Sequence, residues 1–272
     1  YYKKNTANYT VNYYLNGTKI SVDNSINGTA KLGETVTKSP VAITGYTPVS
    51  NDEKSITIGT GTNEINFYYY KNVELTANSY TATYDGNEHS VSGFTGAPDG
   101  AGFRAITVGA AGTNVGTYTA AFADGTVGTV DATGKYIVTA ATDGQLVITP
   151  NTDKVVVTIT ENSGSVKYDG NEHTVTGYKS MTADNTLYDV ATSVQETPTE
   201  AWTAKGTNVG EYPVGIESKD FKNTNANFTN VEFVVVDGAL EITPAPVTLQ
   251  APIASKSYDG TPLEATQFGH SY

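Results

Sequence analysis

The hexapeptide Tyr-Asp-Gly-Asn-Glu-His at residues 84–89 recurs unchanged at residues 168–173, and its first three residues return at residues 258–260. The first two copies start 84 residues apart, at positions 84 and 168, and the third starts 90 residues later, at position 258. A period of this length is the size of a small domain and is longer than a solenoid repeat. The sequence therefore predicts a tandem array of small domains.

Two further motifs fix the internal layout of each module. Gly-Thr-Asn-Val-Gly-x-Tyr occurs at residues 112–118 and 206–212, and Leu-x-Ile-Thr-Pro at 146–150 and 240–244. The second copy is longer than the first. The separation between these two motifs is identical in the two copies, so the additional residues of the second copy fall before the first of the two motifs, between Tyr178 and Lys205. Length variation of this kind is typical of a surface loop.

These landmarks divide the chain into five parts. Residues 8–72 form a distinct N-terminal domain, and residues 73–153 and 154–245 are complete repeats. The fifth part, residues 246–272, holds too few apolar residues for a core of its own. We expect the first part to be the tail of a preceding module and the fifth to be the start of a third repeat. The predicted parts are 1–7, 8–72, 73–153, 154–245 and 246–272.

The residue pattern favours a mainly β fold, because Thr, Val, Tyr, Gly and Asn dominate and runs at helical spacing are scarce. A strand over 9–15, the turn dipeptide Asn16-Gly17 and a strand over 18–22 predict a hairpin. We expect further hairpins through the Asp-Gly pairs at 143–144 and 237–238. A single short helix is predicted near residues 32–41.

Composition excludes several classes of protein. The formal charge is −12, from 28 acidic against 16 basic residues, which argues against nucleic acid or an anionic membrane surface as a partner. The absence of cysteine excludes disulfides and thiolate metal sites. The sequence has no secretory signal peptide and no apolar run long enough to cross a membrane, so we expect an internal fragment of an exported protein with no membrane insertion.

A resemblance to known families rests on these motifs. Leu-Gly-Glu-Thr-Val at 32–36, Gly-Tyr-Thr-Pro at 45–48 and the aromatic stretch 67–71 resemble the MucBP (mucin-binding protein) repeat of Gram-positive surface proteins. The part after residue 72, with Tyr-Asp-Gly, Val-Gly-x-Tyr and Gly-x-Leu-x-Ile-Thr, is similar to the MBG-type repeats of cell-wall adhesins. The resemblance implies an elongated multi-domain array, with a β-grasp-like first domain followed by β-rich repeats of sandwich or β-grasp-like fold.

The repeated histidines, His89 and His173, stand beside Glu88 and Glu172 and are candidate catalytic bases. No nucleophile recurs with them, and an enzyme rarely repeats its base at a tandem period, so we favour a structural role beside the turn. Other candidate sites are weaker. The loop at 128–135 lacks the spacing of a phosphate loop, three residues offer oxygens to calcium at no known ligand spacing, and two lysines are candidates for isopeptide bonds. These residues are Asp184, Asn185 and Asp189 for calcium, and Lys135 and Lys167 for isopeptide bonds.

Trp202 is the only tryptophan and lies with Tyr188 in the region of additional length. Aromatic faces on protruding loops hold sugar rings or partner proteins, so these two residues are the candidate ligand contacts. The alternative is that Trp202 folds inward and fills the base of its loop.

We therefore expect a non-enzymatic segment of a bacterial surface adhesin that binds mucin or other host glycoprotein glycans, that spaces an adhesive tip from the wall, or that does both. The alternatives are a stalk without a ligand and accessory modules of a secreted carbohydrate-active enzyme. The expected setting is extracellular, with wall attachment through regions outside the sequence. We expect no cofactor and no metal, and a monomer within a longer repeat array whose weak single contacts add up.

Overall fold

The computed structural model describes residues 5–20, 27–198, 202–264 and 269–271 of the chain. The fold is mainly β, as the composition predicts. The chain divides into two compact units, Tyr1–Thr149 and Pro150–Tyr272, which are described separately. The division lies close to the predicted boundary at 153/154. The predicted boundary at 72/73, in contrast, lies inside a single strand.

The first unit begins with a sheet built around a parallel pair. β1 (Thr6–Leu15) runs parallel to β7 (Glu64–Ala77), with Val11 opposite Ile65 and Tyr13 opposite Phe67. Alternate side chains of both strands face inward, which the period of two requires. The flanking strands are β2 (Thr18–Lys19), β3 (Asn27–Lys31) and β5 (Tyr46–Pro48), and β4 (Thr35–Lys38) pairs with β6 (Lys54–Thr57). The buried core consists of Tyr9, Val11, Tyr13, Ile58, Ile65, Phe67 and Tyr69.

The first predicted hairpin is confirmed. Leu15 pairs with Thr18, and the two residues between them have positive φ angles, 44° at Asn16 and 81° at Gly17. These angles belong to a type I′ turn, the geometry that matches the twist of the two strands. The end of the predicted second strand, at residues 21 and 22, lies outside the described residues.

The predicted helix near residues 32–41 is wrong. This stretch contains β4, whose Val36 lies opposite Ile56 of β6 in an antiparallel ladder. Three β-branched residues in succession, Thr35 to Thr37, favour a strand, and the ladder supplies the backbone hydrogen bonds that a helix would have supplied.

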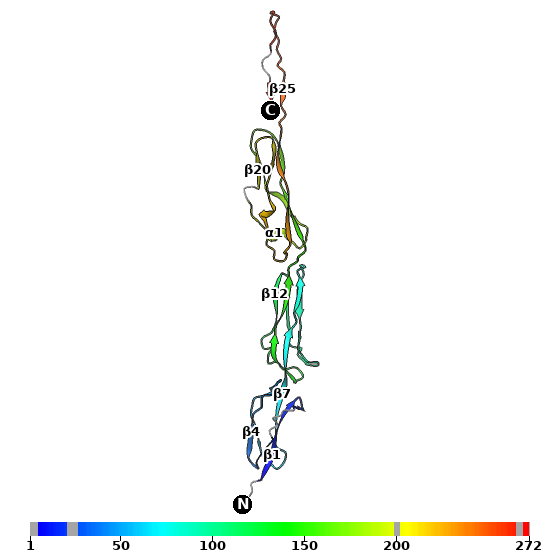
Figure 1. Ribbon diagram of the computed structural model, residues 1–272, viewed down its shortest axis with the longest axis vertical. Helices are drawn as coiled ribbons and strands as arrows, with labels where there is room; N and C mark the ends of the chain where they lie inside the picture. The colour runs from blue at the N-terminus through cyan, green and yellow to red at the C-terminus, as the bar shows by residue number, and fades with distance from the viewer. Residues whose placement is uncertain (1–4, 21–26, 199–201, 265–268, 272) are drawn as a thin grey trace. The chain divides into compact units, whose positions relative to one another are not determined.

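β7 continues into the second half of the first unit, so the two halves share one strand of 14 residues. β1, β4, β7 and β12 all belong to this unit (Figure 1). The second half of β7 lies between β10 (Phe94–Thr95) and β13 (Tyr136–Thr142). A facing sheet has the order β8 (Tyr80–Thr83), β14 (Gly144–Thr149), β12 (Gly116–Phe122), β11 (Val108–Gly112) and β9 (His89–Ser92). The buried side chains here include Val73, Leu75, Phe103, Val138, Leu146 and Ile148.

The second unit pairs its strands in the same order as the second half of the first unit. β15 (Val155–Glu161) lies between β18 (Tyr178–Ala183) and β23 (Val231–Val236), as β7 lies between β10 and β13. β24 (Ala239–Thr243) lies between β16 (Gly164–Lys167) and β21 (Gly210–Pro213), as β14 lies between β8 and β12. The remaining elements are β17 (His173–Thr176), α1 (Val190–Ser193), β19 (Val194–Glu196), β20 (Thr203–Gly206), η1 (Ser218–Asp220), β22 (Phe221–Asn223), β25 (Thr248–Gln250) and β26 (Gly269–Ser271).

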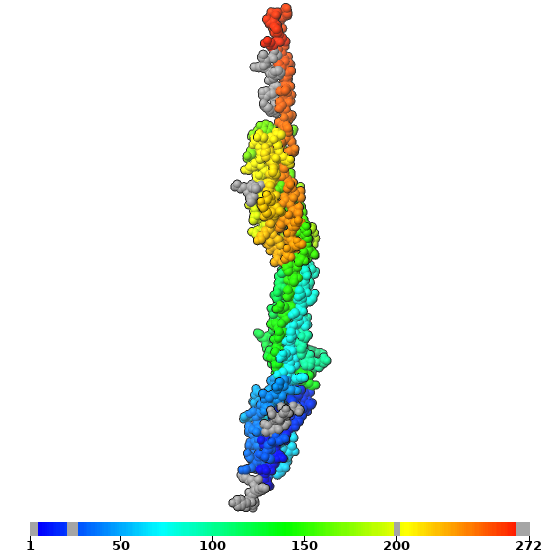
Figure 2. Space-filling view, in the orientation of Figure 1, coloured from blue at the N-terminus to red at the C-terminus, as the bar shows by residue number. Residues whose placement is uncertain are grey.

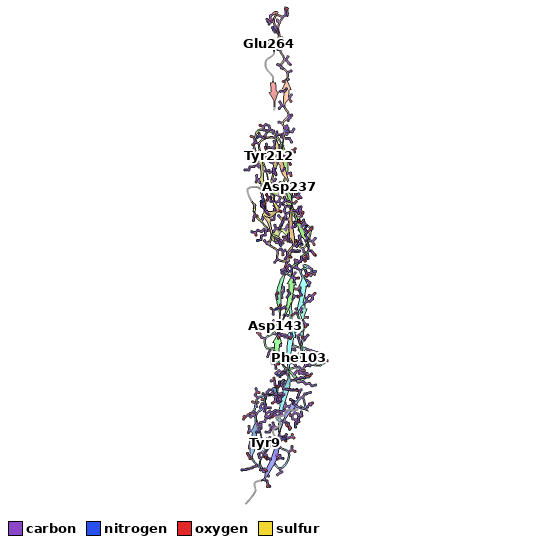
Figure 3. The ribbon with its side chains drawn as sticks, in the orientation of Figure 1. Tyr9, Phe103, Asp143, Tyr212, Asp237 and Glu264 are labelled. Carbon is purple, nitrogen blue, oxygen red and sulfur yellow. The ribbon has the colours of Figure 1, made fainter. Side chains whose placement is uncertain are left out.

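The hairpins predicted at the two later Asp-Gly pairs are wrong. β13 pairs with β7 while β14 pairs with β12 and β8, so the chain passes from one sheet to the other at Asp143, which Figure 3 labels. Gly144 has no positive φ angle, but a Cβ atom on it would lie 2.2 Å from the carbonyl oxygen of Asn78. Gly238 has the same contact with Asn162, also at 2.2 Å. Both glycines are therefore needed for close backbone approach and not for a turn.

The repeated Gly-Thr-Asn-Val-Gly-x-Tyr motif forms a corner held by its tyrosine. The Tyr118 hydroxyl donates to the carbonyl oxygen of Asn114 at 2.8 Å, and a Cβ atom on Gly112 would lie 2.4 Å from the ring. Tyr212, labelled in Figure 3, makes the equivalent bond to Asn208 at 3.0 Å. The motif is thus explained by packing within each module, since the glycine makes room for the ring.

Candidate ligand-contact site

The structure places Trp202 in the interior of the second unit, with 8% of its surface exposed. Its ring stacks on Phe221 at 5.5 Å between centroids and meets the edge of Tyr178 at 6.3 Å. Its indole nitrogen donates to the Asp220 carboxylate at 2.8 Å. The pKa of Asp220 is lowered, first by the bond from the Glu217 amide and also by this indole bond.

Tyr188 is also buried, with 3% of its surface exposed. Its ring packs edge-on against Phe228 at 5.3 Å, and its hydroxyl donates to the side-chain oxygen of Asn223 at 2.9 Å. Burial raises the pKa of this hydroxyl. Neither Tyr188 nor Trp202 presents a ring face to solvent, so their placement favours the alternative in which the aromatic residues fill the base of the loop.

Both histidines lie beside turns. The Asp85 carboxylate accepts a bond from the Asn87 amide at 2.9 Å and lies 3.0 Å from His89 Nε2, while Gly86 has a φ angle of 82°. Asp169, Asn171 and His173 repeat the arrangement, with both bonds at 2.9 Å. An Asp-Gly turn follows the tyrosine of each hexapeptide, and the histidine contacts the turn carboxylate of its own module. This geometry favours the structural role over the catalytic one.

The Asp169 turn gives a testable titration. Its pKa is lowered to about 2, first by the Asn171 amide bond and then by the bond with His173. We expect the midpoint of the Asp169 carboxyl signal, followed by NMR, to rise in His173→Ala but to stay below the ordinary value of about 4, because the amide bond remains. Since the folded pKa is lowered, the turn is stabilised above the ordinary Asp pKa and loses this contribution as the pH falls through about 2.

His89→Ala is the matched control and is expected to leave the Asp169 midpoint unchanged, because His89 contacts Asp85 of the other module. An unchanged midpoint in His173→Ala would contradict the assigned pair.

The residues considered for calcium and for isopeptide bonds have other roles. The side-chain oxygens of Asp184, Asn185 and Asp189 accept backbone amides of Val156, Leu187 and Ala191 at 2.9 to 3.1 Å. Among the described residues, no three His, Cys, Asp or Glu side chains gather as a metal site would require. Lys135 and Lys167 have exposed side chains, which does not fit the buried setting that an isopeptide bond needs.

An aromatic pair that sequence reasoning did not single out lies in the first unit, with one exposed ring and one half-buried ring. Tyr14 and Tyr68 are neighbours on the parallel strands β1 and β7, with ring centroids 5.8 Å apart and ring planes inclined by 30°. Tyr68 exposes 49% of its surface. Lys54 holds its ammonium group 5.3 Å from the Tyr68 ring centroid and donates to the Asn66 carbonyl oxygen at 2.7 Å.

A hollow of about 490 Å³ also lies in this unit, and neither Tyr14 nor Tyr68 lines it. It is lined in part by Lys19, which stands opposite Tyr14 in the β1–β2 ladder, and by Tyr46. The alternation of buried and exposed residues along β7 is the sequence signal that could have identified the exposed Tyr68. Ile65, Phe67 and Tyr69 are buried, so the side chain of Tyr68 between them points to the other face.

The second unit has a larger hollow of about 850 Å³, with an acidic lining. Glu211 and Glu241 stand directly opposite one another on β21 and β24, and Asp237, labelled in Figure 3, also lines the hollow. Glu161 also lines it, but both of its oxygens accept backbone amides, from Ile216 and Gly238, at 2.6 Å. Carboxylates on directly opposite strand residues repel one another, and they repel any anionic ligand. This hollow therefore disfavours sialylated or sulfated glycans.

A scan of the sequence against protein-family models gives no match, and a search of curated proteins finds no similar sequence. Helices among the described residues are too short to cross a membrane, and the only α-helix there has 4 residues.

Proposed function

We propose that the chain is a non-enzymatic segment of a bacterial cell-surface adhesin, in which residues 8–72 contact glycans of mucin or another host glycoprotein and the repeats act as spacers. The observation that carries the proposal is the exposed ring of Tyr68, which stacks on the half-buried Tyr14 and lies beside Lys54. The resemblance of residues 8–72 to a MucBP repeat, with a β-grasp-like fold, and of the later modules to tandem MBG-type repeats, supports it. The proposed setting is extracellular, on the cell wall of a Gram-positive bacterium.

The chemistry of the pair suits a sugar. The exposed face of Tyr68 offers an apolar surface for the C–H face of a pyranose ring, and the tyrosine hydroxyls offer hydrogen bonds to its hydroxyl groups. The Lys54 ammonium adds attraction for the carboxylate or sulfate of an acidic sugar. A single contact of this size is weak, so useful affinity would come from many copies acting together.

Tyr68→Ala is expected to weaken binding of the purified chain to immobilised mucin by about tenfold, because the substitution removes the exposed ring face of the pair. The measurement is surface plasmon resonance with mucin and a glycan panel. Tyr80→Ala is the matched control, because Tyr80 is 50% exposed on β8, away from the pair, and its removal should leave binding unchanged. Equal binding by Tyr68→Ala and the unsubstituted chain would contradict the proposed site.

A second candidate function is a stalk with no ligand, and the continuity of β7 favours it. Its first part pairs with β1 from Glu64 to Tyr69, and its second part pairs with β13 from Lys71 to Thr76. No flexible linker separates the two halves of the first unit, which suits a spacer. Absence of binding by the whole chain to mucin and to every glycan on the panel would favour the stalk, or accessory modules of a secreted carbohydrate-active enzyme, over the adhesin.

A further inference from the structure

β23 has one open edge. Its other edge pairs in parallel with β15, from Val155 opposite Val231 to Thr160 opposite Val236. Among the described residues, no hydrogen bond reaches the backbone of β23 from the open side. Val234 and Val236 are 39% and 46% exposed. The surface of the later strands of this unit is drawn in orange beside the yellow of its middle part (Figure 2).

The equivalent strand of the first unit has this edge closed. A segment at residues 128–131 runs antiparallel along β13, with a bridge between Val130 and Ile137. Val138 accepts a bond from the Gly128 amide at 2.8 Å and donates to the Thr129 carbonyl oxygen at 2.9 Å. The first unit therefore shows what fits this edge, namely an extended antiparallel strand.

The additional residues of the second unit explain why its edge is open. Position 206 corresponds to position 112, an offset of 94 residues, so the counterpart of 128–131 is 222–225. In the second unit this stretch overlaps β22, which pairs with β19 of the additional region, with Val194 opposite Asn223. The Thr224 amide likewise donates to the Ser193 carbonyl oxygen at 2.8 Å. The segment that closes the edge in one module is held elsewhere in the other.

The sequence favours a monomer, but we propose that the open edge of β23 binds a second copy of this chain, through antiparallel pairing of the two β23 strands. A two-fold arrangement of this kind satisfies both open edges at once. The strand lacks two features that protect edges, because it has no proline and its register with β15 has no bulge. Its one charged residue, Glu232, already pairs with Lys154, so pairing of two copies confronts no unpaired charge.

The chain has no cysteine, which allows a direct test of this geometry. Val234→Cys is expected to form a covalent dimer under mild oxidation, because the two β23 strands lie side by side in the pair. Val209→Cys is the matched control, since Val209 is 51% exposed outside β23 and is expected to remain monomeric. Equal crosslinking of the two variants would overturn the proposal.

Sedimentation velocity of the chain without cysteine gives an independent readout. We expect reversible dimerisation that strengthens as salt is added, because salt screens the repulsion between two chains of charge −12. Val234→Lys should weaken dimerisation by about tenfold or more, since a charge on an edge strand opposes pairing. Unchanged Trp202 fluorescence would show that the variant is folded. A sedimentation coefficient independent of concentration in the unsubstituted chain, or unchanged dimerisation in Val234→Lys, would overturn the proposal. This self-association does not depend on glycan binding.

Discussion

Asp131→Ala is expected to lower the free energy of unfolding of the first unit by about 3–5 kcal/mol. The Asp131 carboxylate is 4% exposed and accepts bonds from four backbone amides and one hydroxyl. The amides belong to Gly102, Thr133, Lys135 and Tyr136, and the hydroxyl to Thr133. Removal of the carboxylate leaves these donors, which lie at partly buried bonds, without their acceptor, and a donor left unsatisfied in the interior costs about 1–3 kcal/mol.

The protonation of Asp131 sets the pH range of this effect. Burial raises the pKa of Asp131, but the bonds from Thr133, Tyr136 and Gly102 together lower it by more than burial raises it. The folded pKa therefore lies well below the ordinary value. The stabilisation is therefore complete above the unfolded pKa of about 4 and is lost as the pH falls toward the folded value. Asp131→Asn has no charge to titrate, so its stability deficit should shrink as the pH falls below about 4.

The two units allow the effect to be localised. Trp202, the only tryptophan, lies in the second unit, so its fluorescence reports on unfolding of that unit, while calorimetry reports on both. We expect Asp131→Ala to lower one calorimetric transition and to leave the fluorescence transition in place. Asp124→Ala is the matched control, because Asp124 is exposed in the same region of the chain. Equal melting of the two variants would show that the buried carboxylate is not a stabilising centre.

Much of the local structure was predictable because the signals are local. Asn16-Gly17 specifies its turn through two positive φ angles, and the Asp-Gly turn of each hexapeptide needs only one carboxylate and the amide two residues later. The strand that contains Ile65, Phe67 and Tyr69 has a local signal in its run of aromatic residues, and its buried face follows the alternation of the strand.

The errors arose where partners lie far apart in the sequence. Gly144 and Gly238 look like turn glycines, but they are required by the carbonyl oxygens of Asn78 and Asn162, which directly follow β7 and β15 much earlier in the chain. The additional residues of the second unit look like a free loop, but they form β19 and pair with β22. Neither contact has a signal within a short window of sequence, so periodicity could not have found them.

Trp202→Ala is expected to lower the free energy of unfolding of the second unit by about 3–5 kcal/mol. The substitution removes a ring that stacks on Phe221, which itself stacks on Phe233 at 5.8 Å. It also removes the indole donor to Asp220, which is 6% exposed and keeps the bond from the Glu217 amide at 3.0 Å. Most of the lost stability should therefore come from the cavity that the missing ring leaves, because the Asp220 carboxylate still accepts the bond from the Glu217 amide.

Trp202→Phe separates these two contributions. It keeps an aromatic ring against Phe221 and removes only the indole donor and part of the ring volume, so we expect a smaller loss of about 1–2 kcal/mol. Because both variants lack tryptophan, their stability is measured by calorimetry, with the transition of the first unit as the internal reference.

The same variants decide between the two roles of Trp202. If Trp202 only packs inside its own unit, its substitution lowers the melting temperature. Mucin binding then stays unchanged at temperatures where the variant is folded, because the proposed contact is Tyr68 in the other unit. If mucin binding falls while the melting temperature stays the same, Trp202 must swing out to meet ligand. In that case the loop of the second unit, and not the tyrosine pair of the first, would be the adhesive surface.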